Sequence, residues 1–494
     1  MRNPNMRMVE EEEIPPVTLE VAEYERKDSK EEGLKSIGST DLEVLEEELG
    51  PEYISREHIF FRVIFMNQFF PGIPLGVFQG SLPIILLKKG CSLVDLGHLT
   101  ITNYPMGLKF LYGPFLDRYY SNRIGKRMTY LIPCLYAFGI ISLFYSFFAE
   151  EWTSGLKTIP ISIVGFLLML IAGITMVSTD GYLVSIIQKS KRSYMPMIKL
   201  ISQNLGVFAA YNLFILLNSP EFCNQYLFTI KRDTPLLDYN TFFLIVGVMA
   251  LVYVVIIHLF LYKEPHSEKS FGSLEEILKV ASGFWKNKNL LYCLVFLLFW
   301  RVGFCVIDAY FIPGCIRGGF ARESFIYIQT LLLPFSIITT VMFGRYATKS
   351  KSNIFVLFYL FLVLKTIVSV IQYYFLTKYE TPEQWKGAFW PLTGVLALDT
   401  LQINCYFVAI GAFFARTCDV RIGSTYITVT MSLANFGKLW PETLMYYIMK
   451  EATWEILQIC CWAIGAVFMW FTVRIAKRLE ALDWKDFELD AHTN

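Results

Sequence analysis

The chain has 494 residues, of which 54% are hydrophobic and 16% aromatic, while only 18% are charged. This composition excludes an ordinary water-soluble fold and predicts a polytopic membrane protein, because no soluble domain of this length needs so much apolar surface. The formal net charge of +1 hides a split: residues 1–57 carry 17 acidic and 7 basic side chains, so the remainder is basic.

The ten cysteines are scattered, without CxxC or Cys/His spacing. We therefore expect neither a metal site nor a disulfide framework, and we expect no bound cofactor and no nucleic-acid partner. The polar, acidic start of the chain lacks the basic and then apolar run of a cleavable signal peptide.

Residues 1–57 are expected to form a disordered acidic cytosolic tail, because glutamate clusters such as Glu10 to Glu13 cannot bury a core. One short helix is an alternative near Thr40, where a capping-box spacing to Glu43 precedes leucines on one helix face.

Apolar segments then follow one another to the end of the chain, each long enough for a helix of roughly 20 residues to cross a membrane. The first contains a dense run of prolines and glycines, Pro71 to Gly76, which predicts either a hinge or a packing kink. We predict an all-α membrane protein with twelve transmembrane helices, near residues 59–87, 94–116, 128–148, 158–187, 194–217, 241–262, 289–315, 324–347, 353–377, 387–415, 423–449 and 454–475.

Lysine and arginine are about twice as frequent in one set of alternate loops, which predicts that both termini are cytosolic. The longest loop on that side, 263–288, has an amphipathic spacing and is expected to join two six-helix bundles, 58–262 and 289–477. A second cytosolic tail, 478–494, would end the chain. A six-plus-six transporter joins its two halves at such a loop.

The loop between the second and third segments combines an acidic residue at a helix end with a basic turn. Such charges can latch one conformation of a two-state carrier. The candidate latch residues are Gly113, Asp117, Arg118, Lys126 and Arg127. The alternative is that the basic residues only mark a cytosolic loop.

Ionisable residues inside apolar segments are costly, so each of them needs a partner or a function. Internal pairing is expected for Lys365 with Asp399, for Lys438 with Glu442 and for Arg301 with Asp308. Lys109 has no obvious partner within its own segment, and Asp180 lies about two helical turns from the cytosolic end of the fourth segment. The alternative is an anionic cargo, against which neighbouring aromatic rings would stack a purine; the rings are those of Tyr104, Trp300, Tyr406, Tyr426 and Trp440.

Several motifs together resemble the acetyl-coenzyme A transporters of the endoplasmic reticulum membrane. The similarity runs in order from about residue 60 to the last apolar segment. The motifs are Pro71 to Gly76, Gly80 to Pro83, Leu108 to Pro114, Gly125 to Arg127, Asp180 to Tyr182, Phe222 to Leu227, Gly303-Phe304 with Asp308-Ala309, Ile422 to Thr428, Asn435 to Gly437 and Trp440-Pro441. The chain departs from the family at Lys438 and Glu442, where small or neutral residues are usual.

The resemblance implies that the fold is the major facilitator fold, in two six-helix halves. It also implies a transporter that moves acetyl-CoA from the cytosol into the reticulum lumen, in exchange for CoA, by alternating access. Lys109 and Arg301 would then hold phosphates, and Tyr426 or Trp440 would face the adenine, with Asn435 in the same segment. The alternatives are a related permease for another anionic solute, similar to the muropeptide permeases, and a membrane-bound acetyltransferase. The enzyme is disfavoured because only His98 and His258 lie in or near apolar segments, both close to segment ends.

Overall fold

The computed structural model describes residues 67–121, 124–125, 127–186, 195–260, 288–379, 381–385, 387–417 and 423–482, all within a unit formed by residues 62–494. In these ranges every regular element is a helix, which confirms the all-α prediction. The predicted tail 1–57, most of the loop 263–288 and residues 483–494 lie outside the described residues.

The elements before residue 261 are called the N-terminal helices. They begin with one apolar helical stretch, Asn67–Lys88, that includes the π-helical turn η1. Their bounds are η1 Val77–Ser81, α4 Leu82–Lys88, α5 Leu93–Ile101, α6 Tyr104–Gly107, α7 Lys109–Arg118, α8 Met128–Ser146, α9 Ala149–Ser154, α10 Thr158–Ile186, α11 Met195–Phe208, η3 Ala209–Leu213, α12 Phe214–Leu217, α13 Pro220–Tyr226 and α14 Tyr239–Phe260.

The elements from residue 288 onward are called the C-terminal helices. Most are long, and the first of them is broken in the middle. Their bounds are α16 Lys288–Phe299, the 3-10 turn η4 Val302–Phe304, α17 Cys305–Arg317, α18 Arg322–Lys349, α19 Lys351–Lys378, α20 Pro382–Trp385, α21 Phe389–Thr417, α22 Gly423–Ile448 and α23 Trp454–Ala481.

Nine helical stretches in the described ranges are long and apolar enough to cross a membrane. Each of the other three predicted segments is also helical. Of these, 94–116 is broken into α5, α6 and α7, and 194–217 is interrupted by η3. The third, α22, carries polar and charged side chains along its length. Broken or polar helices are tolerated in a membrane where they face other protein or a water-filled cavity. The count of twelve therefore stays a prediction.

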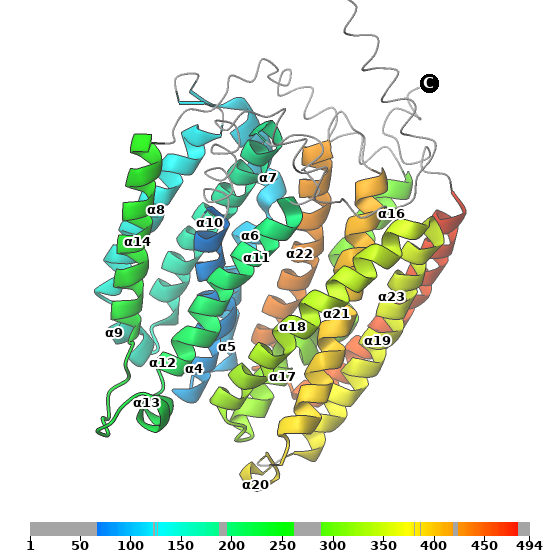
Figure 1. Cartoon of the computed structure of the whole chain (residues 1–494). Helices are drawn as coiled ribbons and strands as arrows, with labels where there is room; N and C mark the ends of the chain where they lie inside the picture. Colours follow the sequence, from blue (N-terminus) through cyan, green and yellow to red (C-terminus); the bar gives the residue numbers. More distant parts are fainter. Residues whose placement is uncertain are drawn as a thin grey trace, which may run out of the picture. The chain divides into compact units, whose positions relative to one another are not determined.

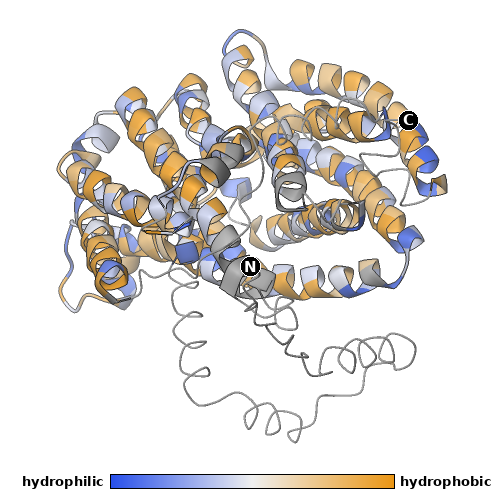
Figure 2. Cartoon of the chain, turned by 90° about the horizontal axis from the view of Figure 1, so that it is seen from above, coloured by the Kyte–Doolittle hydropathy of each residue, from blue (hydrophilic) through white to orange (hydrophobic). Residues whose placement is uncertain are grey.

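α22 contacts more elements of both helix groups than any other described helix. It packs against α5, α6 and α7 among the N-terminal helices and against α16 and α17 among the C-terminal helices, and Figure 1 shows it (orange) between them. Hydrophobic residues cover most of the helices in Figure 2. On α14 alone, large exposed side chains include Leu244, Val248, Val252 and Leu259, as expected for a surface in contact with lipid.

The glycine-rich start of the first apolar stretch is a close helix contact. A Cβ at Gly72 would lie 2.3 Å from the carbonyl oxygen of Gln203, and one at Gly206 would lie 2.2 Å from that of Phe69. Only glycine allows α11 to come so near. The π-helical turn η1 follows directly, a feature often found at functional sites. Of the two sequence interpretations of Pro71 to Gly76, this structure shows the packing role.

Candidate functional site

The helix that runs from α16 to α17 is interrupted at η4, and two features stabilise the break. Gly303 lies against α23, where an added Cβ would be 2.6 Å from the Cα of Gly465. Gln458 of α23 donates from Nε2 to the Gly303 carbonyl at 3.3 Å and accepts from the Ile307 backbone N–H at 2.7 Å. The backbone groups freed by the break are thus satisfied by a side chain that sequence analysis missed. A glutamine inside an apolar segment was the available signal.

The break positions three ionised side chains close together, and we call them the charge triad. Arg301 directly precedes η4, Asp308 lies in the first turn of α17, and Lys365 comes from the middle of α19. Asp308 is the centre: its Oδ2 is 3.4 Å from Arg301 Nη1, and its Oδ1 accepts from Lys365 Nζ. Arg301 is 6% exposed and Lys365 is fully buried.

Aromatic rings surround the two cations of the triad. The guanidinium carbon of Arg301 lies 4.8 Å from the ring centroid of Trp300, and Lys365 Nζ lies 5.5 Å from that of Phe304. Trp300 in turn packs on Tyr406 of α21, with ring centroids 4.2 Å apart. Cation–π contacts of this kind partly replace the hydration that a buried cation loses.

The triad is charged but its hydrogen bonding is incomplete. Within the described structure, Arg301 Nε and Asp308 Oδ2 are buried without a hydrogen-bond partner, as are Trp300 Nε1 and the Tyr406 hydroxyl. Buried polar atoms are normally bonded, so unpartnered ones point to a function or to a missing ligand. An anion entering here would find a guanidinium N–H and aromatic N–H and O–H donors.

α22 adds two more charges to this region. Lys438 is exposed and Glu442 is half-buried, and both interact electrostatically with Asp308. The described residues include no direct ion pair between Lys438 and Glu442, unlike the pairing expected from their spacing. With the triad they make three cations and two carboxylates, so the region is positive by one charge when all are ionised.

One pairing expected from sequence is wrong. Lys365 pairs with Asp308 and not with Asp399. Asp399 instead accepts a hydrogen bond from Gln402 Nε2 on its own helix at 3.1 Å. The physical reason is that similar depth in the membrane does not fix which way a side chain points. The expected pairing of Arg301 with Asp308 agrees with the structure.

Three further candidate residues have no contact with the triad among the described interactions. Lys109, at the start of α7, points to α10, with Nζ 3.6 Å from the Met176 sulfur. The Trp440 indole N–H donates to the Leu298 carbonyl at 2.8 Å, and its ring packs edge-on against Phe299. Trp440 therefore helps to join α22 to α16, which leaves its indole N–H unavailable to a ligand in this conformation. Asn435 is half-buried on α22.

The remaining candidates are placed only in part. The backbone of Gly113, Asp117 and Arg118 is in α7, that of Asp180 is in α10 and that of Tyr426 is in α22, but their side chains lie outside the described part of the chain. Lys126 is also outside it, and Arg127 directly precedes α8. The latch and the contact of Tyr426 with adenine therefore stay predictions.

Hydrogen bonds join the N-terminal and C-terminal helices near the end of the bundle that carries α13. Arg317 donates to the Cys91 carbonyl at 3.1 Å, and the hydroxyls of Thr100 and Thr443 are 2.7 Å apart. Ser219, just before α13, donates to Glu323 of α18 at 3.3 Å. Arg317 bonds the backbone carbonyl of Cys91 and not its thiol, whose pKa burial raises to about 12.

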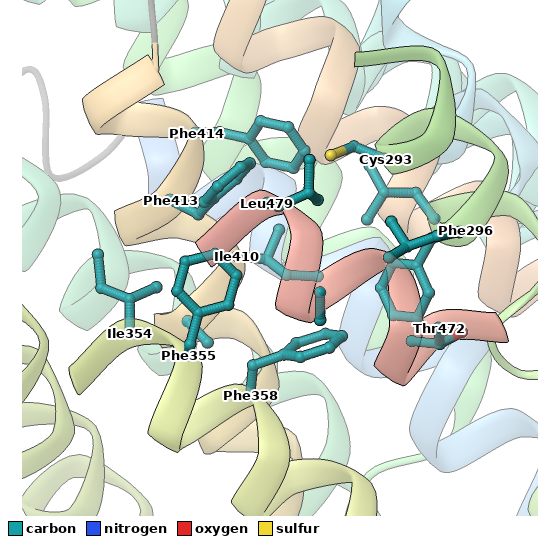
Figure 3. Close-up of a pocket in the computed structure, with 14 residues that line it drawn as sticks. Cys293, Phe296, Ile354, Phe355, Phe358, Ile410, Phe413, Phe414, Thr472 and Leu479 are labelled. Atoms are coloured by element: carbon teal, nitrogen blue, oxygen red, sulfur yellow. The ribbon is translucent and has the colours of Figure 1, made fainter. Parts of the chain in front are cut away.

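Two cavities differ sharply in chemistry. One, of about 60 Å³, lies among α16, α19, α21 and α23, and its lining is almost wholly apolar (Figure 3). It is lined by Phe296, Phe355, Phe358, Phe413 and others, and it offers nothing to bind an anion. The second, of about 290 Å³, lies between α11–η3 and the pair α18 and α21, and several amide and hydroxyl side chains line it.

Comparison with known proteins connects this geometry to transporters. A family model described as acetyl-coenzyme A transporter 1 matches residues 59–289 and 363–468. An uncharacterized protein of Schizosaccharomyces pombe is 24% identical over 418 residues, which cover 83% of this chain and 78% of that protein. An uncharacterized membrane protein of Saccharomyces cerevisiae is 22% identical over 473 residues, covering 80% of this chain and 84% of the other.

The solved structures that are similar share the fold at low sequence identity. A bacterial homologue of the human lysosomal transporter Spinster, inward-facing and unoccupied, gives a TM-score of 0.56 at 13% identity and covers 88% of this chain and 99% of that one. The D-xylose–proton symporter gives 0.54 at 12% identity, with 83% and 96% covered. The likeness to these two transporters is one of fold.

Proposed function

Because the chain belongs to the acetyl-coenzyme A transporter 1 family, we propose that it carries acetyl-CoA from the cytosol into the lumen of the endoplasmic reticulum, in exchange for free CoA. The proposal includes twelve transmembrane helices in two six-helix halves, with both termini cytosolic. Uptake is by alternating access, in which one site opens in turn to each side.

The observation that carries the proposal is the charge triad. Acetyl-CoA is an anion with a 3′-phosphate and a pyrophosphate, and arginine and lysine are the natural phosphate binders. In the empty carrier, Asp308 serves as the counter-ion of Arg301 and Lys365. A cargo phosphate can replace Asp308 at Arg301, whose Nε has no hydrogen-bond partner in the described structure. Lys365 then keeps Asp308 from being left unpaired.

The contacts between the two groups of helices suit the alternating mechanism. Arg317 with Cys91 and Thr100 with Thr443 are hydrogen bonds of modest net strength, about 0.5–1.5 kcal/mol each. Bonds of this strength can close one end of the bundle and still break in every transport cycle. In the proposed orientation this closed end is the lumenal one.

Uptake of doubly labelled acetyl-CoA into proteoliposomes of the purified chain tests the proposal. The acetyl group and the adenine carry separate labels. Equal entry of both labels, stimulated by CoA loaded inside, is the expected result. Entry of acetyl alone would indicate an acetyltransferase and would overturn the proposal.

One observation favours a second candidate, a permease for another anionic solute. Lys438 and Glu442, where the sequence resemblance predicts a departure from the family, interact electrostatically with the triad. They change the charge pattern that a cargo meets, as a muropeptide-like cargo with both amines and carboxylates would require. Competition between acetyl-CoA and such peptides for uptake in the same vesicles separates the two candidates.

A further inference from the structure

The larger cavity lies between elements of the two helix groups and is uncharged. Its volume is about 290 Å³, and its lining includes Asn204, Asn212, Gln329, Ser336 and Thr400, with apolar side chains between them. Nothing in the lining is ionisable at neutral pH, which sets this cavity apart from the charge triad. Ligand sites typically combine an apolar wall with a few placed polar groups, and this lining fits that description.

One buried atom in the lining lacks a partner. Asn212 is only 4% exposed, and its Nδ2 donates to Thr330 Oγ1 of α18 at 3.1 Å. Its Oδ1 is buried without a hydrogen bond in the described structure. A buried carbonyl oxygen that has lost water is unfavourable unless an N–H or O–H reaches it. Asn212 belongs to the lining of the cavity, so this oxygen is the acceptor that an amide N–H bound there would satisfy.

Some of the neighbouring polar side chains in the cavity already make hydrogen bonds within the protein, and others make none within the described part of the chain. Thr400 already donates to the Leu396 carbonyl at 2.8 Å, and Ser336 is bonded by Asn404. Gln329 and Asn204 are half-buried, and the described contacts show no side-chain hydrogen bond for either. Both amides can donate and accept at once, as a second amide group would require.

The cavity and the charge triad are connected through α21. Ile403 lines the cavity, and Tyr406, about 4.5 Å further along the helix, packs on Trp300. Trp300 lies against the Arg301 guanidinium. The cavity lining and the aromatic residues beside Arg301 are thus less than one turn of α21 apart, a separation that one extended solute is long enough to span.

We propose that this cavity is a subsite for the pantetheine arm of CoA, the uncharged part that carries two amides and a hydroxyl. The inference rests on the proposed function, because the triad would hold the phosphates of the same cargo. The volume is near the lower limit of ligand pockets, about 300 Å³, which suits an arm better than a whole nucleotide. Asn212 accepts one amide N–H, and Gln329 and Asn204 bond the second amide.

Binding of three probes to the purified full chain tests the subsite. CoA has the arm, the adenosine and the phosphates, adenosine 3′,5′-bisphosphate has the adenosine and phosphates without the arm, and pantetheine has only the arm. Gln329→Leu and Asn204→Leu are expected to weaken CoA binding by roughly three- to tenfold each and to leave adenosine 3′,5′-bisphosphate unchanged. Equal weakening of both probes, or of neither, overturns the proposal. Unchanged CoA affinity is also the result expected if water or a lipid chain fills the cavity.

A matched control separates ligand contact from contact between helices. Thr330→Val removes the hydrogen bond to Asn212 but keeps the Asn212 acceptor, so CoA affinity should stay within twofold while Asn212→Leu lowers it. Equal losses in the two variants would overturn the role of Asn212 as a ligand contact.

If the wild-type chain binds neither CoA nor adenosine 3′,5′-bisphosphate, the proposed function fails, and the subsite is then tested by pantetheine alone. Binding of pantetheine that Gln329→Leu abolishes supports the subsite, and absence of such binding overturns it.

Discussion

Two interrupted helices of this molecule use the same packing device with opposite chemistry. The first apolar stretch contains the π-helical turn η1 and brings Gly72 against Gly206 of α11. The α16–α17 helix contains the 3-10 turn η4 and brings Gly303 against Gly465 of α23. In both places two helices approach until backbone touches backbone, which only glycine permits.

The polar groups beside the two breaks differ. Near η1 they are neutral, as in the hydrogen bond from Gln79 to Asn103 at 3.0 Å. Near η4 they are the ions Arg301, Asp308 and Lys365. Packing therefore explains the glycines in both regions, but it does not explain the ions. A buried ion pair is a poor source of stability, so its presence beside only one break indicates a function there.

The largest effect should come from removing the carboxylate at the centre of the triad. Asp308→Asn leaves Arg301 and Lys365 buried and unpaired, which should cost about 3–5 kcal/mol and markedly lower the thermal midpoint in detergent. Adding Lys365→Met to it removes one of the two uncompensated cations and should restore a large part of the loss. Gln79→Leu, beside the neutral break, should cost much less. If Gln79→Leu lost as much stability as Asp308→Asn, the contrast between the two breaks would be contradicted.

Replacing the contacting glycine by a larger residue should destabilise the protein to a similar extent in the two regions. Gly303→Val and Gly72→Val each force a side chain against backbone atoms at 2.6 and 2.3 Å, and overpacking of this kind costs about 1–3 kcal/mol. Gly394→Ala is the control, because a Cβ there meets nothing within 4 Å. Thermal unfolding of the three variants checks this. Tolerance of valine at one break but not at the other would show that the contacts are not equivalent.

Much of this architecture could be predicted from sequence because it depends on local composition. Apolar runs of membrane length produced helices at every predicted segment, while residues 71–76 form regular helix up to the π-helical turn η1. The pairing of Arg301 with Asp308 was also predictable, because seven residues along a helix returns to the same face. The break at η4 between them did not disturb that relation.

What sequence did not predict depends on the orientation of helices about their axes. Lys365 was expected to meet Asp399 because both lie at similar depth, but rotation of α19 directs it to Asp308. Trp440 was expected to face a cargo ring, and instead its indole N–H is bonded to the Leu298 carbonyl. Asn212 and Gln458 drew no attention, since neutral amides carry no charge signal in a sequence. Their roles come from atoms more than a hundred residues away.

Measurements of ligand affinity should distinguish the role of Arg301 from those of Asp308 and Lys365 more clearly than measurements of stability. Arg301→Gln leaves Asp308 paired with Lys365, so the fold should lose little. Binding of acetyl-CoA and of CoA should both fall about tenfold or more, since one charge-assisted contact is worth about 1.5–3 kcal/mol. Equilibrium binding of both ligands measures this. Unchanged affinity for CoA would assign Arg301 a purely structural role.

The smallest expected effect concerns the N-terminal helices, whose candidate functional charges lie at the end of α7 and in the loop that follows it, and not at the break. Asp117→Ala or Arg118→Ala should slow acetyl-CoA uptake severalfold and change its affinity less than twofold, because a latch biases a conformational equilibrium without touching cargo. Ser121→Ala, in the same loop, is the control and should leave the uptake rate unchanged. Uptake rates and binding constants, measured on the same proteoliposomes, separate the two effects. If affinity falls as much as rate, these charges contact the cargo, and the N-terminal helices then contribute ions to the site just as the C-terminal helices do.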